Sequence, residues 1–338
     1  MTETPMRDLP TLTLPGDEAP AAPLLADYLA GLKDVPEGLT AILTAIAGAV
    51  PALGARLAAG LLPGDPARIV GTNDSGDKQK ALDVGAHEHV MAALRAAPVR
   101  LVLSEEAEEI ATLDPDAAYD IAMDPIDGSG SIGIGAPLGL LFCVFPAAPE
   151  GFLRTGRSVI AAGYVSFGHS VDLGFSFGQG LDIATFDATA GAFRVHAPGV
   201  TLKPKTSTIA YNASNARHWG AGIRDYITDI ERGKDGPRGR DFNMRWLGAA
   251  VGDMHRILLQ GGLFLYPADA RKGYEKGRLR LLYEAFPMAY IVEQAGGRAT
   301  DGTTAILDIL PTEPHGHCPL IFGSSEEVEA LMGYMSKG

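Results

Sequence analysis

Six apolar segments between Tyr119 and Ala210 constrain the fold of this chain more than any other feature. Each is short, rich in β-branched or aromatic residues and bounded by Gly, Pro or Asp, which is typical of β-strands. They read YDIAM, LGLLFCVFP, SVIAAGYVSFG, VDLGFSFG, LDIATFD and AFRVHAP. Helical spacing of apolar residues occurs outside this run, at 24–62, 81–97, 244–262 and 281–297, and 318–335 reads as a strand plus a helix. Helical segments on both sides of a strand-rich centre predict a layered α/β protein.

The ends of these patterns divide the chain. Residues 1–23 contain no basic stretch followed by an apolar one, so they do not resemble a secretion signal and are expected to form a mobile leader. A second division falls near Lys203 to Thr208. We therefore expect an N-terminal α/β subdomain at 24–205 and a C-terminal α/β subdomain at 206–338.

The most apolar segment runs from Leu39 to Leu62 and is interrupted by Pro51 and Arg56. Because proline breaks or kinks a helix, this spacing favours two packed helices over a membrane span. Residues 63–77 are dense in turn formers and predict a long flexible loop. Long loops beside acidic residues are often lids.

The composition excludes several classes of protein. With 338 residues and 46% hydrophobic content, the chain can bury a large core. A formal charge of −13 argues against a nucleic-acid partner, since binding to the phosphate backbone needs clustered Lys and Arg. Only Cys143 and Cys318 are present, too few for a disulfide framework, which favours packing roles and a cytoplasmic location. No G-x-G-x-x-G lies between a strand and a helix, which argues against a dehydrogenase.

The stretch IAMDPIDGSGSIG, residues 121–133, ends an apolar run with two aspartates. Asp124 precedes Pro125, which favours an extended conformation and is expected to end the strand. Asp127 and Gly128 then form a turn signal. The two carboxylates would share a small space, where like charges repel unless a cation or protons intervene.

A hard divalent cation would resolve this repulsion. Carboxylates and a backbone carbonyl such as that of Ile126 are the oxygen donors that Mg²⁺ prefers. A short helix from Gly128 to Ser131 would present N–H groups to an anion in the same space. Two carboxylates, a metal and an amide cradle indicate phosphate chemistry, and an ordinary Asp-rich turn is the alternative interpretation.

Further acids stand where other strands or loops meet helices. Each could be a solvated surface charge, but Asp124 and Glu284 adjoin several apolar residues, and buried carboxylates need a partner or a metal. Such a site could hold two or three Mg²⁺ ions that polarise a phosphoryl group. The acids concerned are Asp77, Asp83, Glu105, Glu106, Asp124, Asp127 and Glu284.

A second group of residues is basic and aromatic and precedes Glu284 in the sequence. Its alternative interpretation is a solvated surface. Arg and Lys would instead suit a remote phosphate of a substrate whose other phosphate lies at the metals. The members are Arg245, Trp246, Tyr266, Lys272, Lys276, Arg278 and Arg280.

Six motifs lie between Gly71 and Val328: GDKQKALDV, SEE, DPIDGS, DMHRILLQGGLFLYPA, GRLRLLYEAFPMAYIVEQAGGRAT and AILDILPTEPHGHCPLIFGS. With these motifs the chain closely resembles class I fructose-1,6-bisphosphatase. The resemblance implies an αβαβα sandwich of the sugar-phosphatase type, which inositol monophosphatases share. It also implies Mg²⁺-dependent hydrolysis of the 1-phosphate of fructose 1,6-bisphosphate, in gluconeogenesis or the Calvin cycle, with Mn²⁺ as a possible substitute.

The resemblance also implies roles for individual residues. Asp83 and Glu106 would orient and deprotonate the attacking water. The expected metal ligands are Asp77, Glu105, Asp124, the Ile126 carbonyl, Asp127 and Glu284. The expected substrate-binding residues are Asp127, Gly128, Ser129, Gly130, Asn212, Arg245, Tyr266 and Arg278. Arg245 would reach a neighbouring subunit's site, and the family implies a homotetramer.

Departures from the family pattern concern specificity and regulation. Arg278 stands where the family usually has Lys, and Trp246 and Ala216 stand where tyrosines are common. Sedoheptulose 1,7-bisphosphate is therefore a second substrate to consider. Ala118 and Pro146 replace the Lys and Arg with which animal-type relatives bind AMP, so weak or absent AMP inhibition is expected.

Two other functions remain open at this point. One is an inositol-phosphate or nucleotide monophosphatase with the same metal design, which would have no second phosphate to bind. The other is a non-catalytic sensor of sugar phosphates, which would lack a metal ligand or a base, whereas every expected carboxylate is present.

Overall fold

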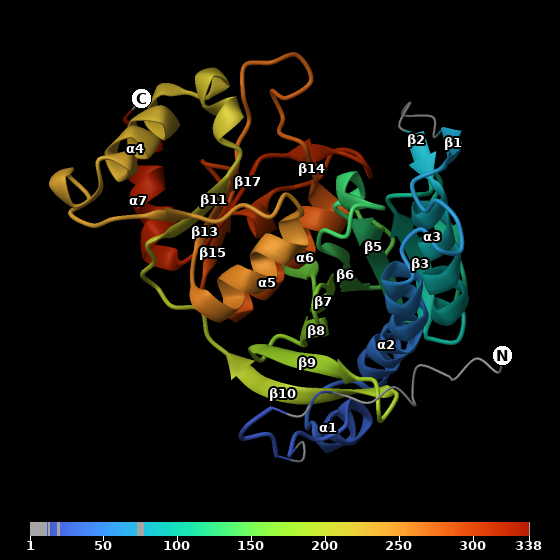
Figure 1. The fold of residues 1–338 in the computed structure, drawn as a ribbon. Coiled ribbons are helices and arrows are strands. Elements are labelled where there is room, and N and C mark those ends of the chain that lie inside the picture. The colour runs from blue at the N-terminus through green and yellow to red at the C-terminus, as the bar shows by residue number, and fades with distance from the viewer. Residues whose placement is uncertain (1–11, 13, 19–20, 73–77, 338) are drawn as a thin grey trace.

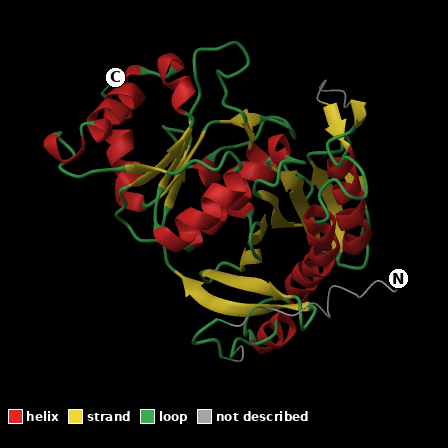
Figure 2. Cartoon of the chain, viewed as in Figure 1, coloured by secondary structure: helices red, strands yellow, loops and turns green. Residues whose placement is uncertain are grey.

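Five alternating layers of helices and sheets make up the protein, as Figure 1 shows. The computed structural model describes residues 12, 14–18, 21–72 and 78–337. The expected leader, residues 1–23, therefore lies mostly outside the described residues. Figure 2 shows one pair of helices, α5 and α6, between the two large sheets, with further helices on their outer faces.

The larger sheet has the strand order β10-β9-β8-β7-β6-β5-β3-β4. Only β3 and β5 are parallel neighbours in it, and the other pairs are antiparallel. All six strands expected between residues 119 and 210 are confirmed. The bounds are β3 (Val99–Ser104), β4 (Ala111–Thr112), β5 (Tyr119–Asp127), β6 (Leu138–Pro146), β7 (Ala161–Phe167), β8 (Val171–Ser176), β9 (Leu181–Asp187) and β10 (Ala192–Val200).

The second sheet has the order β12-β11-β13-β17-β15, and two short pairs, β1-β2 and β14-β16, complete the strands. Its strands are β11 (Thr208–Tyr211), β12 (Asn243–Met244), β13 (Leu263–Tyr266), β15 (Arg298–Thr300) and β17 (Leu320–Gly323). The short pairs are β1 (Ile69–Thr72) with β2 (Lys78–Lys80), and β14 (Leu279–Arg280) with β16 (His317–Cys318).

The helices form three layers around these sheets (Figure 1). The first layer contains α1 (Leu25–Gly31), α2 (Glu37–Ala58) and α3 (Ala81–Leu94), the central one α5 (Ala250–Gln260) and α6 (Phe286–Gln294), and the last α4 (Ala221–Glu231) and α7 (Ser325–Met335). Short 3-10 or π-helical segments occur at η2 (Ser129–Ser131), η3 (Gly156–Ser158), η4 (Ala213–His218), η5 (Gly233–Asp235), η6 (Leu281–Ala285) and η7 (Ile306–Asp308).

Strand β6 shows why the central strands read as unbroken apolar runs. Its alternate residues enter two different cores: Leu141 and Cys143 pack with α5 and α6, whereas Leu140 and Phe142 pack with α2 and α3. Successive side chains on a strand point to opposite faces, so a sheet covered on both faces needs apolar residues at every position. A third core, between the second sheet and the helices α4 and α7, completes the five layers.

Helix α2 corrects one expectation. Residues 39–62 do not form two helices, because α2 continues through Pro51 to Ala58. Proline removes one backbone hydrogen bond, but buried residues on either side, such as Ile46 and Leu53, hold both halves against the same core. By length and composition alone, α2 could cross a membrane. Its apolar face is packed in the core, as the sequence interpretation expected.

Two element boundaries also differ from expectation. Strand β5 does not end at Asp124 but continues to Asp127 through a bulge. The helix expected at 244–262 begins only at Ala250, because Asn243–Met244 pairs with β11 and Gly248 adopts a positive φ of 86°. The sequence predicts a loop at residues 63–77. Within the described part of this segment, Ile69–Thr72 instead forms β1, which pairs with β2.

Candidate active site

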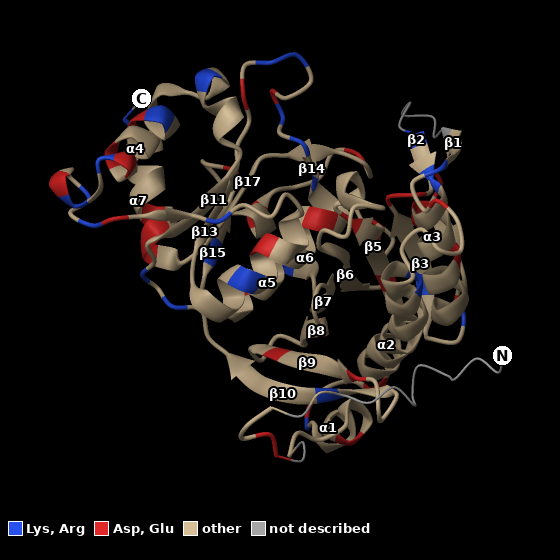
Figure 3. Ribbon diagram, viewed as in Figure 1, with Lys and Arg blue, Asp and Glu red and all other residues tan. Residues whose placement is uncertain are grey.

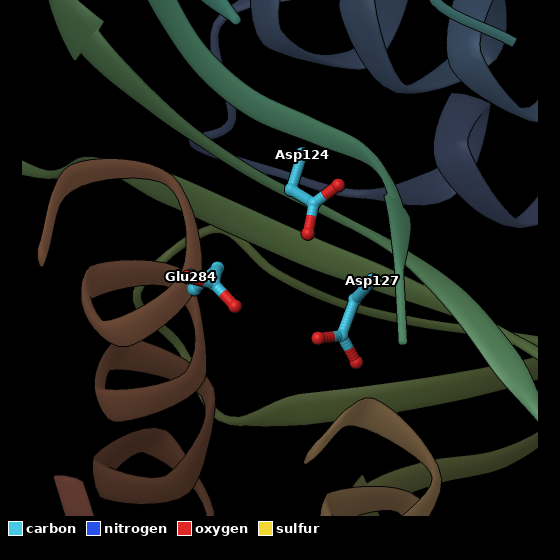
Figure 4. Close-up of side chains that lie close together, drawn as sticks. All are labelled: Asp124, Asp127 and Glu284. Carbon is cyan, nitrogen blue, oxygen red and sulfur yellow. The ribbon is translucent and has the colours of Figure 1, made fainter. Parts of the chain in front are cut away.

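Asp124, Asp127 and Glu284 bring their carboxylates together in the interior of the protein. One oxygen atom from each lies within 4.8 Å of the others, and the three residues are only 1%, 5% and 7% exposed. Figure 4 shows the two aspartates on their strand facing the glutamate on its helix. Oxygen donors in this arrangement fit a hard divalent cation such as Mg²⁺.

The bulge in β5 is what aims both aspartates into this space. Residues three apart on a regular strand point to opposite faces. Here Asp124 pairs with Leu141 and Asp127 pairs with Gly139, so β5 has one residue more than β6 between these pairs. The extra residue restores a common direction for both carboxylates. Pro125 lies inside the bulge, where its missing N–H costs no regular ladder bond.

Glu284 comes from a different local irregularity. It lies on the π-helical turn η6, which leads directly into α6. The backbone N–H of Arg280 donates to Glu284 Oε2. Pro287 at the start of α6 has no N–H for an ordinary α-helical bond at this point, which favours the wider turn.

Burial and mutual repulsion dominate the electrostatics of the cluster. Burial and then the nearby charges of Glu105 and Asp127 raise the pKa of Asp124 well above its usual range. Burial likewise raises the pKa of Glu284 well above its usual range and that of Asp127 to about 6. Asp124 Oδ2 is buried and accepts no hydrogen bond from the described residues. An unpartnered buried oxygen at this place fits a metal ligand.

Glu105 and Glu106 follow β3, next to the end of the parallel strand β5. The N–H of Glu105 donates to the carbonyl of Met123 at 3.2 Å, which fixes Glu105 beside Asp124. Burial raises the pKa of Glu105 to about 7. Gln79 Nε2 lies 3.0 Å from the carbonyl oxygen of Glu106 and 3.3 Å from its carboxylate, so β2 contacts this segment.

Asp83 is buried in the first turn of α3. Its Oδ2 accepts the N–H of Lys80 at 3.1 Å, whereas its Oδ1 is buried without a partner among the described residues. Burial raises the pKa of Asp83, and the N–H of Lys80 opposes that shift. Lys80 also donates from Nζ to the carbonyl of Ser129, which connects α3 to the turn after β5.

The turn after β5 has the expected form of a short helix. Gly128 adopts a φ of 86°, and a Cβ at this position would lie 2.7 Å from Ala249 Cβ. Only glycine suits both constraints. Ser129 and Gly130 follow on the 3-10 turn η2 and are exposed. The turn can therefore present backbone and hydroxyl groups to a ligand.

The other expected substrate residues lie around β13 and the loop that follows it. Tyr266 is half-buried and stacks on Trp246, with ring centroids 6.3 Å apart. Arg245 and Arg278 are exposed. Asn212 caps η4, where its Oδ1 accepts the N–H of Ser214 at 3.1 Å. Figure 3 shows the basic residues of the loop between β13 and β14.

The expected ligand Asp77 lies outside the described residues. The lid role of its loop therefore stays a prediction. The two cysteines are both free and buried, in agreement with packing roles.

Sequence reasoning missed the part that α5 plays in the site. The N–H of Val251 donates to Asp127 Oδ2 at 2.8 Å. Asp253, fully buried on the same helix, accepts the N–H of Leu247 at 3.0 Å and thereby fixes the segment that contains Arg245 and Trp246. A lone aspartate in the apolar helix AVGDMHRILLQ was the only available signal.

The alternating layers and the buried acids define an α/β sandwich of the fructose-bisphosphatase and inositol-monophosphatase type. Family models for the N-terminal and C-terminal domains of fructose-1,6-bisphosphatase match residues 33–198 and 202–336. Curated class 1 fructose-1,6-bisphosphatases of Brucella anthropi and Brucella suis are each 50% identical over 331 residues, covering 96% of this chain and 97% of theirs.

A solved structure gives the same result. Leishmania major fructose-1,6-bisphosphatase in its holo form has a TM-score of 0.87 and 30% identity, covering 94% of this chain and 100% of that chain. The chain therefore belongs to the class 1 fructose-1,6-bisphosphatase family. It is an enzyme, a phosphoric monoester hydrolase of carbohydrate metabolism, and the resemblance read from the sequence is confirmed.

The raised pKa values predict how pH affects the metal-free protein. A carboxyl group whose folded pKa is raised stabilises the fold below its unfolded pKa, and this stability is lost as pH rises through the folded pKa. For Glu105 that window runs from 4.5 to about 7. In a chelator, the melting temperature should therefore fall as pH rises from about 5 to about 8, and Mg²⁺ should restore it at high pH.

Thermal melts with and without Mg²⁺ measure this effect. Asp124→Asn should flatten the pH dependence, because it removes one of the repelling charges, whereas Asp116→Asn, at an exposed position, should not. A melting temperature that is independent of pH in the chelator would contradict the electrostatic interpretation.

Proposed function

We propose that the protein hydrolyses the 1-phosphate of fructose 1,6-bisphosphate to give fructose 6-phosphate and phosphate. The observation that carries this proposal is the cluster of three buried carboxylates beside the exposed turn at Ser129. The name of the curated relatives, at 50% identity, supports this choice of substrate over an inositol phosphate or a nucleotide. A second, basic region suits a substrate with two phosphates.

We propose Mg²⁺ as the cofactor, at two or three ions per subunit, with Mn²⁺ as a substitute. Asp124, Asp127 and Glu284 would hold it, assisted by Glu105, the Ile126 carbonyl and Asp77. Bound Mg²⁺ supplies Lewis-acid polarisation of the phosphoryl oxygens and lowers the pKa of a coordinated water. The buried, unpartnered Asp124 Oδ2 supports this assignment.

The protein's own groups would handle the water and the phosphate. Glu106 and Asp83 are the general-base candidates that orient the attacking water and accept its proton. Asp127 and the turn formed by Gly128, Ser129 and Gly130 would hold the transferred phosphoryl group. Asn212, Arg245, Tyr266 and Arg278 would bind the sugar and its remote phosphate. Phosphoryl transfer to water through a loose transition state needs mainly such positioning and charge stabilisation.

Phosphate release tests this function. We expect metal-dependent turnover of fructose 1,6-bisphosphate, and Asp124→Asn should lower kcat/KM by about 100-fold or more, because it removes a metal ligand and a charge. Asp116→Asn, at an exposed position before β5 and outside the cluster, should retain activity. Turnover of inositol 1-phosphate alone would show that the metal site is assigned correctly and the substrate wrongly.

Sedoheptulose 1,7-bisphosphate is a second substrate that we propose to measure in the same assay. Trp246 and Ala216 lack the hydroxyls of the tyrosines common in the family, and Trp246 is stacked on Phe264 with 5.5 Å between centroids. The ratio of kcat/KM for the two bisphosphates would place the enzyme in gluconeogenesis or in the Calvin cycle.

We also propose that AMP inhibits this enzyme weakly or not at all. Tyr119 pairs with Pro146 at the strand ends where animal-type relatives have AMP-binding residues. The ring of Tyr119 packs against the first turn of α2, since a Cβ on Gly38 would be 2.5 Å from it. Steady-state rates should change by less than about twofold at 1 mM AMP, since a ligand that does not bind shifts no equilibrium; sub-millimolar inhibition would contradict this.

A homotetramer in the cytoplasm is the assembly and location that we propose. The exposed Arg245, whose Nη1 donates only to its neighbour Met244 at 2.9 Å among the described residues, is available to a neighbouring subunit. The two free cysteines suit a reducing compartment. Light scattering on the active enzyme should give four times the chain mass of 35.4 kDa, and a fully active monomer would contradict this.

A further inference from the structure

The loop from Asp269 to Arg278 combines positive charge with an aromatic ring. It connects β13 to β14 and forms the orange loop at the top of Figure 1. Four of its residues are basic, as the blue segments in Figure 3 show. They are Arg271, Lys272, Lys276 and Arg278. Tyr274 lies between them in the sequence.

Backbone hydrogen bonds fix the position of Tyr274 in this loop. Its carbonyl accepts the N–H of Asp269 at 3.1 Å and that of Gly277 at 3.0 Å, and its own N–H donates to Arg271 at 2.9 Å. Gly277 adopts a φ of 79°, and any Cβ there would overlap the backbone of Cys318. The loop is therefore closed on itself and packed against β16.

Two guanidinium groups lie over the ring of Tyr274. The Cζ of Arg271 is 4.0 Å from the ring centroid, and that of Arg278 is 4.9 Å from it. Both distances are within the range of cation–π attraction. Tyr274 is half-buried, whereas Arg278 is exposed.

The two arginines differ in their charge balance. Arg271 Nε donates to both carboxylate oxygens of Asp269, at 2.9 and 3.0 Å, and the buried Asp269 neutralises it. The hydrogen bond from Arg271 lowers the pKa of Asp269, so this pair stays ionised. Arg278 makes no ion pair with any of the described residues. Its charge is therefore available to an anion.

We propose that Tyr274 is a positioning residue whose ring holds the Arg278 guanidinium in place for the remote phosphate of the sugar bisphosphate. This inference rests on the proposed function. A free arginine side chain loses much rotational freedom when it binds a phosphate with two parallel hydrogen bonds. Stacking on a fixed ring removes part of that loss before the substrate arrives.

The neighbours of the ring agree with this role. Burial and then the nearby Tyr274 raise the pKa of Tyr266, an expected substrate residue, whereas the nearby positive charge of Arg278 lowers it. Tyr266 in turn stacks on Trp246. Tyr274 and Arg278 therefore lie near enough to Tyr266 to affect its ionisation.

Four variants test the proposal by steady-state kinetics with fructose 1,6-bisphosphate. Tyr274→Leu should raise KM by about threefold to tenfold and leave kcat within about twofold, since the lost interaction acts on binding. Tyr274→Phe keeps the ring and should leave both constants within about twofold of the wild type. Arg278→Ala should raise KM, and adding Tyr274→Leu to it should raise KM no further.

Binding of fructose 6-phosphate, measured by calorimetry without metal, gives a second readout that does not require turnover. We expect the dissociation constant to change as KM does: it should rise in Tyr274→Leu and in Arg278→Ala and stay within about twofold in Tyr274→Phe. Thermal melts would confirm that each variant is folded. An unchanged affinity in Tyr274→Leu, an equal loss in Tyr274→Phe, or an undiminished effect in the Arg278→Ala background would overturn the proposal. Wild-type protein that binds fructose 6-phosphate but releases no phosphate would refute the proposed function alone.

Discussion

Three carboxylates share one buried space in this protein, and the structure around them depends on that arrangement. Taking even one ionised carboxylate out of water costs several kcal/mol unless it is paired. Asp124, Asp127 and Glu284 lie within 4.8 Å of one another, so their repulsion adds to this cost. The apolar cores on the two faces of the larger sheet stabilise the folded protein against the cost of burying these carboxylates. A metal ion would reverse the sign of the interaction, since each carboxylate would then face a positive charge.

Helix α5 connects this cluster to the rest of the site. Its first turn donates the Val251 N–H to Asp127, and the next residues place Asp253 against the N–H of Leu247. Gly139 in β6 lets α5 come this close, because any Cβ there would overlap Val251. The acid cluster and the segment carrying Arg245 and Trp246 are thereby held by one rigid element. Sites built on such elements keep their geometry better than sites on loops alone.

Most of the fold could be predicted from the sequence, because the patterns that specify it are local. The six strands between residues 119 and 210 were recognised from apolar runs and turn formers, and their uninterrupted apolar character matches a sheet covered on both faces. The errors fell where distant contacts override local preference. Pro51 should have broken α2, yet packing on both sides holds the helix together. Pro125 should have ended β5, yet pairing with β6 continues to Asp127.

The chemistry of this protein could be read from the sequence alone: which residues are acids, that some of them adjoin apolar segments, and that basic and aromatic residues precede the last acid. Such properties belong to residue types and short spacings, which need no knowledge of distant contacts. Which acids meet depends instead on the three-dimensional fold. A bulge in one strand, a π-turn before a helix and the backbone of α5 bring Asp124, Asp127 and Glu284 together. The fold also places Tyr274 against Arg278, because the conformation of a loop depends on what the loop packs against.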